Sequence, residues 1–161
     1  MSIIEVYADN LTKKDCKHLP RHIAARAVVI HQEKVLLLYL KKNEVYNLPG
    51  GGLEKGETLD QCVLRELKEE TGYLGLTPIP TMTVIEYYPN GIFESHFYRV
   101  DLASEIPMER NLTEEEIEQG IDLLWLSIEE ALERLDSSPT KHPHGQNIHA
   151  RESLGLFHSI S

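Results

Sequence analysis

The stretch that decides the fold is ELKEETG, residues 66–72, which places negative charge at the end of a helix. Upstream of it, Thr58 and Gln61 have the spacing of a capping box, in which each side chain bonds the backbone N–H of the other residue. Gly72 provides a left-handed stop. The pattern therefore predicts one helix over residues 59–71.

Glu66, Glu69 and Glu70 are unfavourably placed in this helix. Carboxylates in the last turns oppose the helix dipole by roughly 0.3–1 kcal/mol each, and like charges three or four residues apart cost roughly 0.2–0.5 kcal/mol per pair. The three glutamates also continue the apolar side of the first two turns. A hard cation such as Mg²⁺ would cancel their repulsion, because it prefers oxygen ligands. The alternative is a solvated acidic helix end with Arg65 and Lys68 as partners.

The composition is that of one acidic domain. With 161 residues, of which 41% are hydrophobic, the chain can form one sizeable core, and we expect a single domain over residues 1–161. The net charge of −10 argues against nucleic acid or an anionic membrane as the main partner, because both are polyanions. A phosphate substrate stays compatible with this charge if a metal ion supplies positive charge.

Cysteine usage indicates a reducing compartment. Cys16 and Cys62 occur in a chain without a signal-peptide pattern, which favours free thiols in a reducing cytoplasm over a disulfide between them. Cys62 falls on the inward side of the predicted helix. The longest apolar stretches are far too short to span a bilayer. We therefore expect a cytoplasmic protein with no membrane segment.

The rest of the chain predicts more strands than helices. Residues 24–30 and 34–40 are β-rich runs around a short turn, and they predict an antiparallel hairpin. The other expected segments are an N-terminal strand or arm over residues 1–20, strands over 74–88, 92–102 and 121–126, an exposed acidic connection over 104–119, a helix from its cap Ser127 to about Leu135, a loop over 136–147 and a C-terminal helix over 150–160. This order predicts an α/β fold with a mixed sheet covered by helices.

The acidic helix belongs to a longer pattern that resembles the Nudix box. The pattern is Gly-x5-Glu-x7-Arg-Glu-Leu-x-Glu-Glu-x-Gly-Tyr, and its seven identities to the box are Gly51, Glu57, Arg65, Glu66, Glu69, Glu70 and Gly72. Seven identities at fixed spacing lie far beyond chance at typical residue usage. The departure is Tyr73, aromatic at a position where the family usually has an aliphatic residue that packs. The approach Leu-Pro-Gly-Gly-Gly and the later strand with its acidic helix extend the resemblance over roughly residues 22–135.

The resemblance implies a Nudix-type α/β/α sandwich with a mixed β-sheet between helices. It also implies a pyrophosphohydrolase that uses Mg²⁺ or Mn²⁺ to cleave a nucleoside diphosphate linked to another group X. By match to the box, Glu66, Glu69 and Glu70 would be metal ligands, with the carbonyl of Gly50 as a further ligand.

Other residues receive roles from the same match. Glu57 would lie near the metal cluster, where Arg65 orients it by a paired hydrogen bond. Metal ions would neutralise the diphosphate and lower the pKa of a bound water, and a carboxylate must accept the water's proton. That base can be a box glutamate or one from a later loop, and among the glutamates of residues 114–118 we favour Glu118, then Glu115.

Substrate contacts are less well defined by the sequence. Arg26 and Lys41 could contact substrate phosphates, although basic residues at strand ends usually lie on the surface. Pro89, about sixteen residues past the box, resembles the ADP-ribose-cleaving subgroup. The candidate substrates are ADP-ribose or a nucleotide sugar, and (d)NTPs including oxidised forms. The histidines at 142, 144 and 149 fall in an irregular loop, which argues against a transition-metal site.

Two other functional classes stay open at this point. A non-catalytic Nudix-fold module that senses a nucleotide would be expected to have lost box glutamates, and here all of them are present. A Nudix-fold isomerase of isoprenoid diphosphates would need a reactive cysteine in its pocket, and neither cysteine is well placed. The hydrolase is the favoured hypothesis, and a homodimer through the N-terminal arm stays open.

Overall fold

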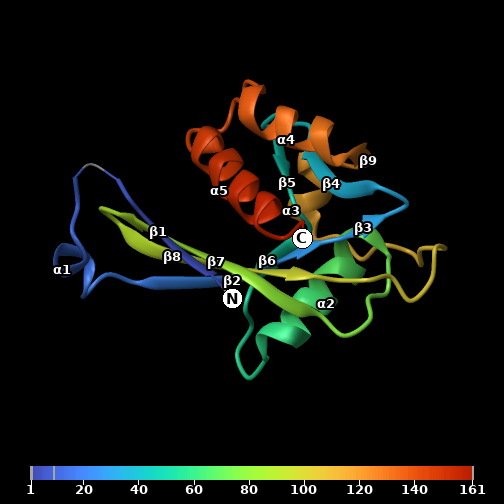
Figure 1. Cartoon of the computed structure of the whole chain (residues 1–161), viewed down its shortest axis with the longest axis horizontal. Helices are drawn as coiled ribbons and strands as arrows, with labels where there is room; N and C mark the ends of the chain where they lie inside the picture. The colour runs from blue at the N-terminus through green and yellow to red at the C-terminus, as the bar shows by residue number, and fades with distance from the viewer. Residues whose placement is uncertain (1, 9, 161) are drawn as a thin grey trace.

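The computed structural model describes residues 2–8 and 10–160 as two β-sheets with helices on both sides (Figure 1). The larger sheet has five strands in the order β1-β7-β8-β2-β6, where β1 is Ser2–Tyr7, β2 Arg21–Val28, β6 Gly50–Gly52, β7 Ile79–Tyr88 and β8 Gly91–Arg99. Strands β1 and β7, and β2 and β8, are parallel, whereas β7–β8 and β2–β6 are antiparallel. The mixed sheet expected from the sequence is therefore present.

A second sheet forms around β4. It comprises β3 (Ile30–His31), β4 (Lys34–Leu40), β5 (Val45–Asn47) and β9 (Ile121–Ser127). Strands β3, β5 and β9 each pair antiparallel with β4. The expected hairpin is only partly formed, because two residues of β3 pair with β4 while β2 joins the larger sheet. The turn between β3 and β4 uses left-handed backbone at Gln32 and Glu33.

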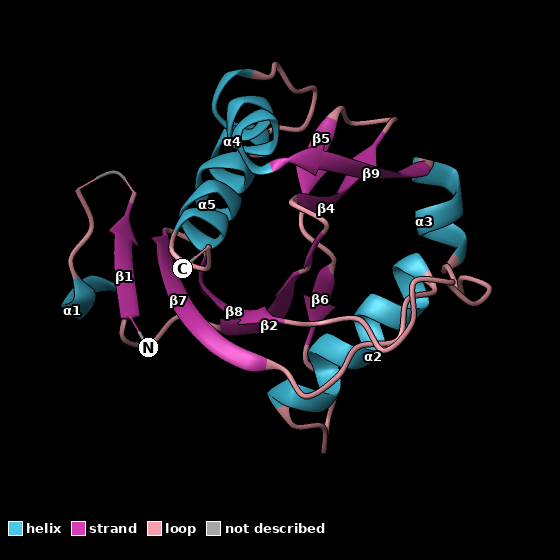
Figure 2. Ribbon diagram, turned by 45° about the vertical axis from the view of Figure 1, so that its right-hand side comes forward, coloured by secondary structure: helices cyan, strands magenta, loops and turns pink. Residues whose placement is uncertain are grey.

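The helices lie on opposite sides of the larger sheet (Figure 2). Helix α2 (Leu59–Thr71) lies on one side, with α4 (Ile128–Ser137) and α5 (Gly145–Phe157) on the other. Helix α2 confirms the sequence prediction to the residue, with the Thr58–Gln61 capping box and a left-handed Gly72 at its end. Ser127 caps α4 as predicted. Helix α1 (Lys13–Cys16) is a single turn near the N-terminus.

Two helical segments differ from expectation. Residues 114–119, expected to be an exposed connection, form the short helix α3 (Glu114–Gln119), which begins at a capping box of Thr113 and Glu116. Helix α5 begins at Gly145 rather than at Ala150, so it takes in residues 145–147, the end of the expected loop. Its N-terminus has no side-chain cap, and the sequence therefore carried no start signal.

Side chains on the two faces of the central strands pack into two separate cores. Ala25 and Ala27 of β2 pack with Cys62, Val63 and Leu67 of α2. The next residue along the strand, Val28, faces the other way and packs with side chains of β7, α4 and α5. This alternation is what a sheet buried on both faces requires, and it produces the α/β/α sandwich. No helix in the described part of the chain is long and apolar enough to cross a membrane.

Substitution of Gly72 tests how tightly the C-terminal end of α2 is packed against the segment that carries Met108. Gly72 has φ of 82°, and a Cβ there would collide with the carbonyl oxygen of Met108. Gly56 has φ of 79° but open space around it. We expect Gly56→Ala to lower the free energy of unfolding by about 1–2 kcal/mol through backbone strain alone. Gly72→Ala should lower it by a further 1–3 kcal/mol, roughly, because of the collision.

Urea unfolding of the two metal-free variants measures this difference. Equal losses in the two variants would show that the segment carrying Met108 moves aside, and that the end of α2 is not fixed by it.

Candidate active site

Helix α2 directs its glutamates toward the glycine strand β6. Glu66 lies close to Gly51, where a Cβ would sit 2.5 Å from Glu66 Oε1, so a larger residue there would displace the Glu66 carboxylate. Glu70 is 7% exposed and accepts a hydrogen bond of 2.7 Å from the backbone N–H of Gly50. Glu69 is more exposed and lies at the outer side of the same turn. Glu66 and Glu70 therefore line the junction of α2 with β6, whereas Glu69 contacts Arg65 at the outer side of the helix.

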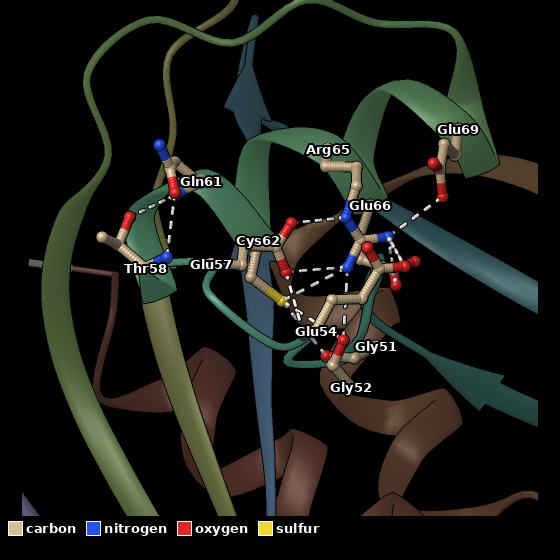
Figure 3. Close-up of polar contacts among 10 residues, drawn as sticks. All are labelled: Gly51, Gly52, Glu54, Glu57, Thr58, Gln61, Cys62, Arg65, Glu66 and Glu69. Atoms are coloured by element: carbon tan, nitrogen blue, oxygen red, sulfur yellow. Dashed lines mark hydrogen bonds and ion pairs between the residues drawn. The ribbon is translucent and has the colours of Figure 1, made fainter.

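Arg65 binds several of these carboxylates at once (Figure 3). Its Nε and Nη2 donate to the two oxygens of Glu57 at 2.6 and 3.0 Å, which is the paired hydrogen bond expected from the sequence. Its Nη1 donates to Glu66 at 3.0 Å and to Glu69 at 3.1 Å. Nη2 also donates to the carbonyl of Gly52 at 3.2 Å. One guanidinium thus connects the helix, the loop before it and strand β6.

The pKa values of the carboxylates reflect two different environments. The hydrogen bonds from Arg65 lower the pKa of Glu57 to about 2, so Glu57 stays ionised. Burial, together with the charge of Glu66, raises the pKa of Glu70 well above its ordinary value of 4.5. Burial also raises the pKa of Glu66, against the opposing effect of Arg65. Burial is thus the larger cause of both raised pKa values, and repulsion from neighbouring glutamates adds to it.

This set of side chains fits a hard divalent cation. The donors are carboxylate oxygens beside glycine backbone, which suits Mg²⁺ or Mn²⁺ rather than a soft metal. Within residues 2–8 and 10–160, no three His, Cys, Asp or Glu side chains already converge on one point. The reason is visible in the contacts, since Arg65 holds Glu66 and Glu69 while Glu70 turns to Gly50. A bound cation would replace part of the charge that Arg65 now supplies.

Arg26 lies inside the protein and not on the surface. Its side chain is 14% exposed, it is paired in register with Gly50, and its positive charge lowers the pKa of Glu70. Nε of Arg26 is buried, lies 3.8 Å from Glu152 Oε1 and has no hydrogen-bond partner among the described residues. Lys41, by contrast, is 58% exposed and pairs with Asp122 at 3.5 Å. Of the two basic candidates, the structure brings Arg26 to the carboxylates.

The structure does not bring Glu118 to the site. Its side chain is 72% exposed and pairs with Lys42 at 3.0 Å. Another residue of α3, Glu116, is the one whose charge raises the pKa of Glu66 and of Glu70. Figure 2 shows α3 beside the end of α2, and the N–H of Asn111 bonds the carbonyl of Glu69 there. The Thr113-to-Glu116 spacing of a capping box was the sequence signal for this helix.

Two hollows lie near the site without including its carboxylates. One, of about 340 Å³, lies between the β3–β4 turn and Trp125, where Tyr73 packs edge-on against Trp125 as its position in the box predicted. The other, of about 240 Å³, is lined by Glu86, Tyr88 and Arg151 on the α5 side of the sheet. Neither hollow was predicted from the sequence.

Comparison with known proteins agrees with this geometry. The model of the NUDIX domain matches residues 20–146. An ADP-ribose pyrophosphatase of Bacillus subtilis is 25% identical over 145 residues, which cover 84% of this chain and 77% of that protein. An ADP-ribose pyrophosphatase of Methanocaldococcus jannaschii is 37% identical over 71 residues, and these cover 40% of this chain and 42% of that protein.

A solved structure shares both the fold and the arrangement of elements. A NUDIX hydrolase from Nitrosomonas europaea superposes with a TM-score of 0.61 and 25% identity, over 82% of this chain and 90% of that one. The family model covers well over half of the chain and includes all of α2, its capping loop and strand β6. The chain therefore belongs to the Nudix family, whose fold and box residues it carries in full.

Proposed function

We propose that this protein is a Mg²⁺- or Mn²⁺-dependent hydrolase of the diphosphate bond in a nucleoside diphosphate linked to another group. The observation that carries the proposal is the junction of α2 with β6, where Glu66 and Glu70 have raised pKa values beside glycine backbone. A site that raises the pKa of two adjacent carboxylates is costly for stability unless a cation binds them. Membership of the Nudix family supports the same reaction type.

The residues would share the work as follows. Glu66, Glu69 and Glu70 would hold the cation, with the carbonyl of Gly50, and Arg65 with Glu57 would keep α2 and its loop in place. When bound, the cation neutralises the diphosphate and lowers the pKa of a water molecule. Arg26 would attract a phosphate oxygen through the charge of its guanidinium, because that charge already acts on Glu70. Lys41 would contribute at most a charge at the rim.

ADP-ribose or a related adenosine diphosphate is the substrate class that we favour. Two similar proteins are ADP-ribose pyrophosphatases, and one of them aligns with 84% of this chain. Pro89 lies in the turn between β7 and β8, in the position that suggested the same subgroup. Nucleotide sugars and (d)NTPs are the alternatives that the same chemistry would accept.

We assign the role of proton acceptor to a carboxylate whose charge affects the pKa values of the site glutamates. Among the α3 glutamates this criterion replaces Glu118 with Glu116, since the charge of Glu116 acts on both Glu66 and Glu70. Glu118 is engaged by Lys42 at the surface. Glu116 also accepts a capping hydrogen bond from the N–H of Thr113 at 2.9 Å, which fixes where its carboxylate lies.

A substrate panel tests the proposal directly. We expect wild-type protein to form AMP from ADP-ribose only with Mg²⁺ or Mn²⁺, when ADP-ribose, nucleotide sugars and (d)NTPs are compared by chromatography. Glu69→Gln and Glu70→Gln should lower the rate by about 100-fold or more, because each removes an anionic cation ligand. Glu133→Gln, a surface change on α4, is the control. Wild-type rates in both ligand variants would refute the metal-site assignment, and nucleotide binding without turnover would favour a sensor.

The raised pKa of Glu70 predicts that cation binding releases protons. The folded protein binds more protons than the unfolded chain between pH 4.5 and the raised pKa, so the metal-free protein should lose stability as the pH rises through this window. Cation affinity should increase over the same window, because the cation competes with the proton. Calorimetric Mn²⁺ titration in two buffers of different ionisation enthalpy measures the released protons. Glu70→Gln should release fewer protons, and an unchanged release would assign it to another group.

Glu116 and Glu118 provide a matched pair for the proton acceptor. Glu116→Gln retains the capping box, since glutamine serves at this position too, but removes the charge near Glu66 and Glu70. We expect kcat to fall by about 10²–10⁴-fold in Glu116→Gln and to stay near wild type in Glu118→Gln. Steady-state kinetics at saturating cation measure both values. A larger loss in Glu118→Gln would restore Glu118 as the base.

A further inference from the structure

Helix α5 covers the open edge of strand β5 with two buried acceptors. Strand β5 pairs with β4 along one edge, and its other edge leaves the N–H groups of Tyr46 and Leu48 without strand partners. His149 Nε2 accepts from the N–H of Tyr46 at 2.9 Å, and Glu152 Oε1 accepts from the N–H of Leu48 at 3.0 Å. His149 and Glu152 are three residues apart on one helical face, which matches the two-residue spacing of the N–H groups.

Glu152 is also held electrostatically from two sides. Its side chain is 0% exposed, its Oε2 accepts from Arg151 Nε at 3.3 Å, and its Oε1 lies 3.8 Å from Arg26 Nε. Arg151 in turn lies 3.6 Å from Glu86 of β7. A buried carboxylate with this many partners costs desolvation that only close neighbours offset. Its position in the molecule is therefore narrowly defined.

Two residues after Leu48, a carboxylate from the other side of the sheet binds the same segment. The N–H of Gly50 donates to Glu70 of α2, and the carbonyl of Pro49 accepts from the N–H of Ala27 at 2.7 Å. The segment of residues 48–50 is thus fixed by α5 at its start, by β2 in its middle and by α2 at its end. Pro49 fixes one backbone angle between Leu48 and Gly50, so a displacement of Leu48 has fewer ways to be absorbed before Gly50.

We propose that Glu152 is a positioning residue of the active site, which sets the place of Gly50 and its carbonyl through the N–H of Leu48 and orients Arg26 through its charge. The inference rests on the proposed function, in that Gly50 and Glu70 are assigned there to the cation. Glu152 touches neither the cation nor the substrate in this role. It acts from a helix that the box does not include.

Two conservative substitutions separate the effect of the side-chain length of Glu152 from the effect of its charge. Glu152→Gln keeps a side-chain oxygen at the same distance from Leu48 but removes the negative charge. Glu152→Asp keeps the charge but is one methylene shorter, so it cannot reach the N–H of Leu48 from the same backbone position. Both variants should melt at a lower temperature than wild type, since both disturb a buried ion-paired group. The control is Ser153→Ala, also on α5, which removes an exposed hydrogen bond to Asp136 of α4.

Cation binding and amide exchange then decide the role of Glu152. In Glu152→Asp, we expect the dissociation constant for Mn²⁺ to rise by about 10–100-fold. The electron paramagnetic resonance signal of free Mn²⁺ measures this constant. Hydrogen exchange at Leu48 and Gly50 should accelerate by about tenfold or more, because a bond to a charged group is lost. Glu152→Gln should stay within about threefold of wild type in both measurements, although it too is destabilised.

The opposite pattern would overturn the proposal. If both variants weaken Mn²⁺ binding equally, in step with their melting temperatures, Glu152 has a structural role alone. If Glu152→Asp accelerates exchange at Leu48 but not at Gly50, its effect ends at the helix contact and the positioning role is refuted. If wild-type protein binds no Mn²⁺, the cation assignment fails by itself, and exchange at Gly50 still decides whether Glu152 positions the segment.

Discussion

The active site depends on one short segment that two buried glutamates hold from opposite sides of the sheet. Glu152 of α5 binds the N–H of Leu48, and Glu70 of α2 binds the N–H of Gly50. The two helices share no core cluster, since α2 packs on one face of the sheet and α5 on the other. The segment between them is therefore where the two halves of the sandwich are joined by polar contacts, and it is also where the proposed cation would bind.

The second constraint is the guanidinium of Arg65. A single cationic side chain satisfies Glu57 with two hydrogen bonds and also neutralises Glu66 and Glu69. It therefore offsets part of the repulsion among the carboxylates at the acidic end of α2. Glu70, which Arg65 does not reach, has a raised pKa instead. The negative charge of Glu66, Glu69 and Glu70 is thus only partly offset by Arg65, which suits binding of a cation with its substrate.

Residues around the carboxylates differ in how directly the structure supports a role for them. The proposed role of Arg26 in binding phosphate rests on its positive charge, which lowers the pKa of Glu70 and therefore acts at the carboxylates. The hollow beside Glu86, Tyr88 and Arg151 is connected to Arg26 by ion pairs through Glu152. The box residues point to a reaction type and do not define the group X, because a shared fold and motif do not fix the substrate.

The sequence alone determined helix α2, its capping box, its left-handed end and the three glutamates, because each of these features depends on residues close together in the chain. It also indicated the paired hydrogen bond of Glu57 with Arg65, eight residues apart. The tertiary structure decided the rest of the site. Arg26 and Glu116 came to the carboxylates through sheet register and helix placement, Glu118 turned to Lys42, and Glu152 reached Leu48 from 104 residues away. Local propensities carry no information about such contacts, since side chains far apart in sequence meet only after the sheet and its helices have packed.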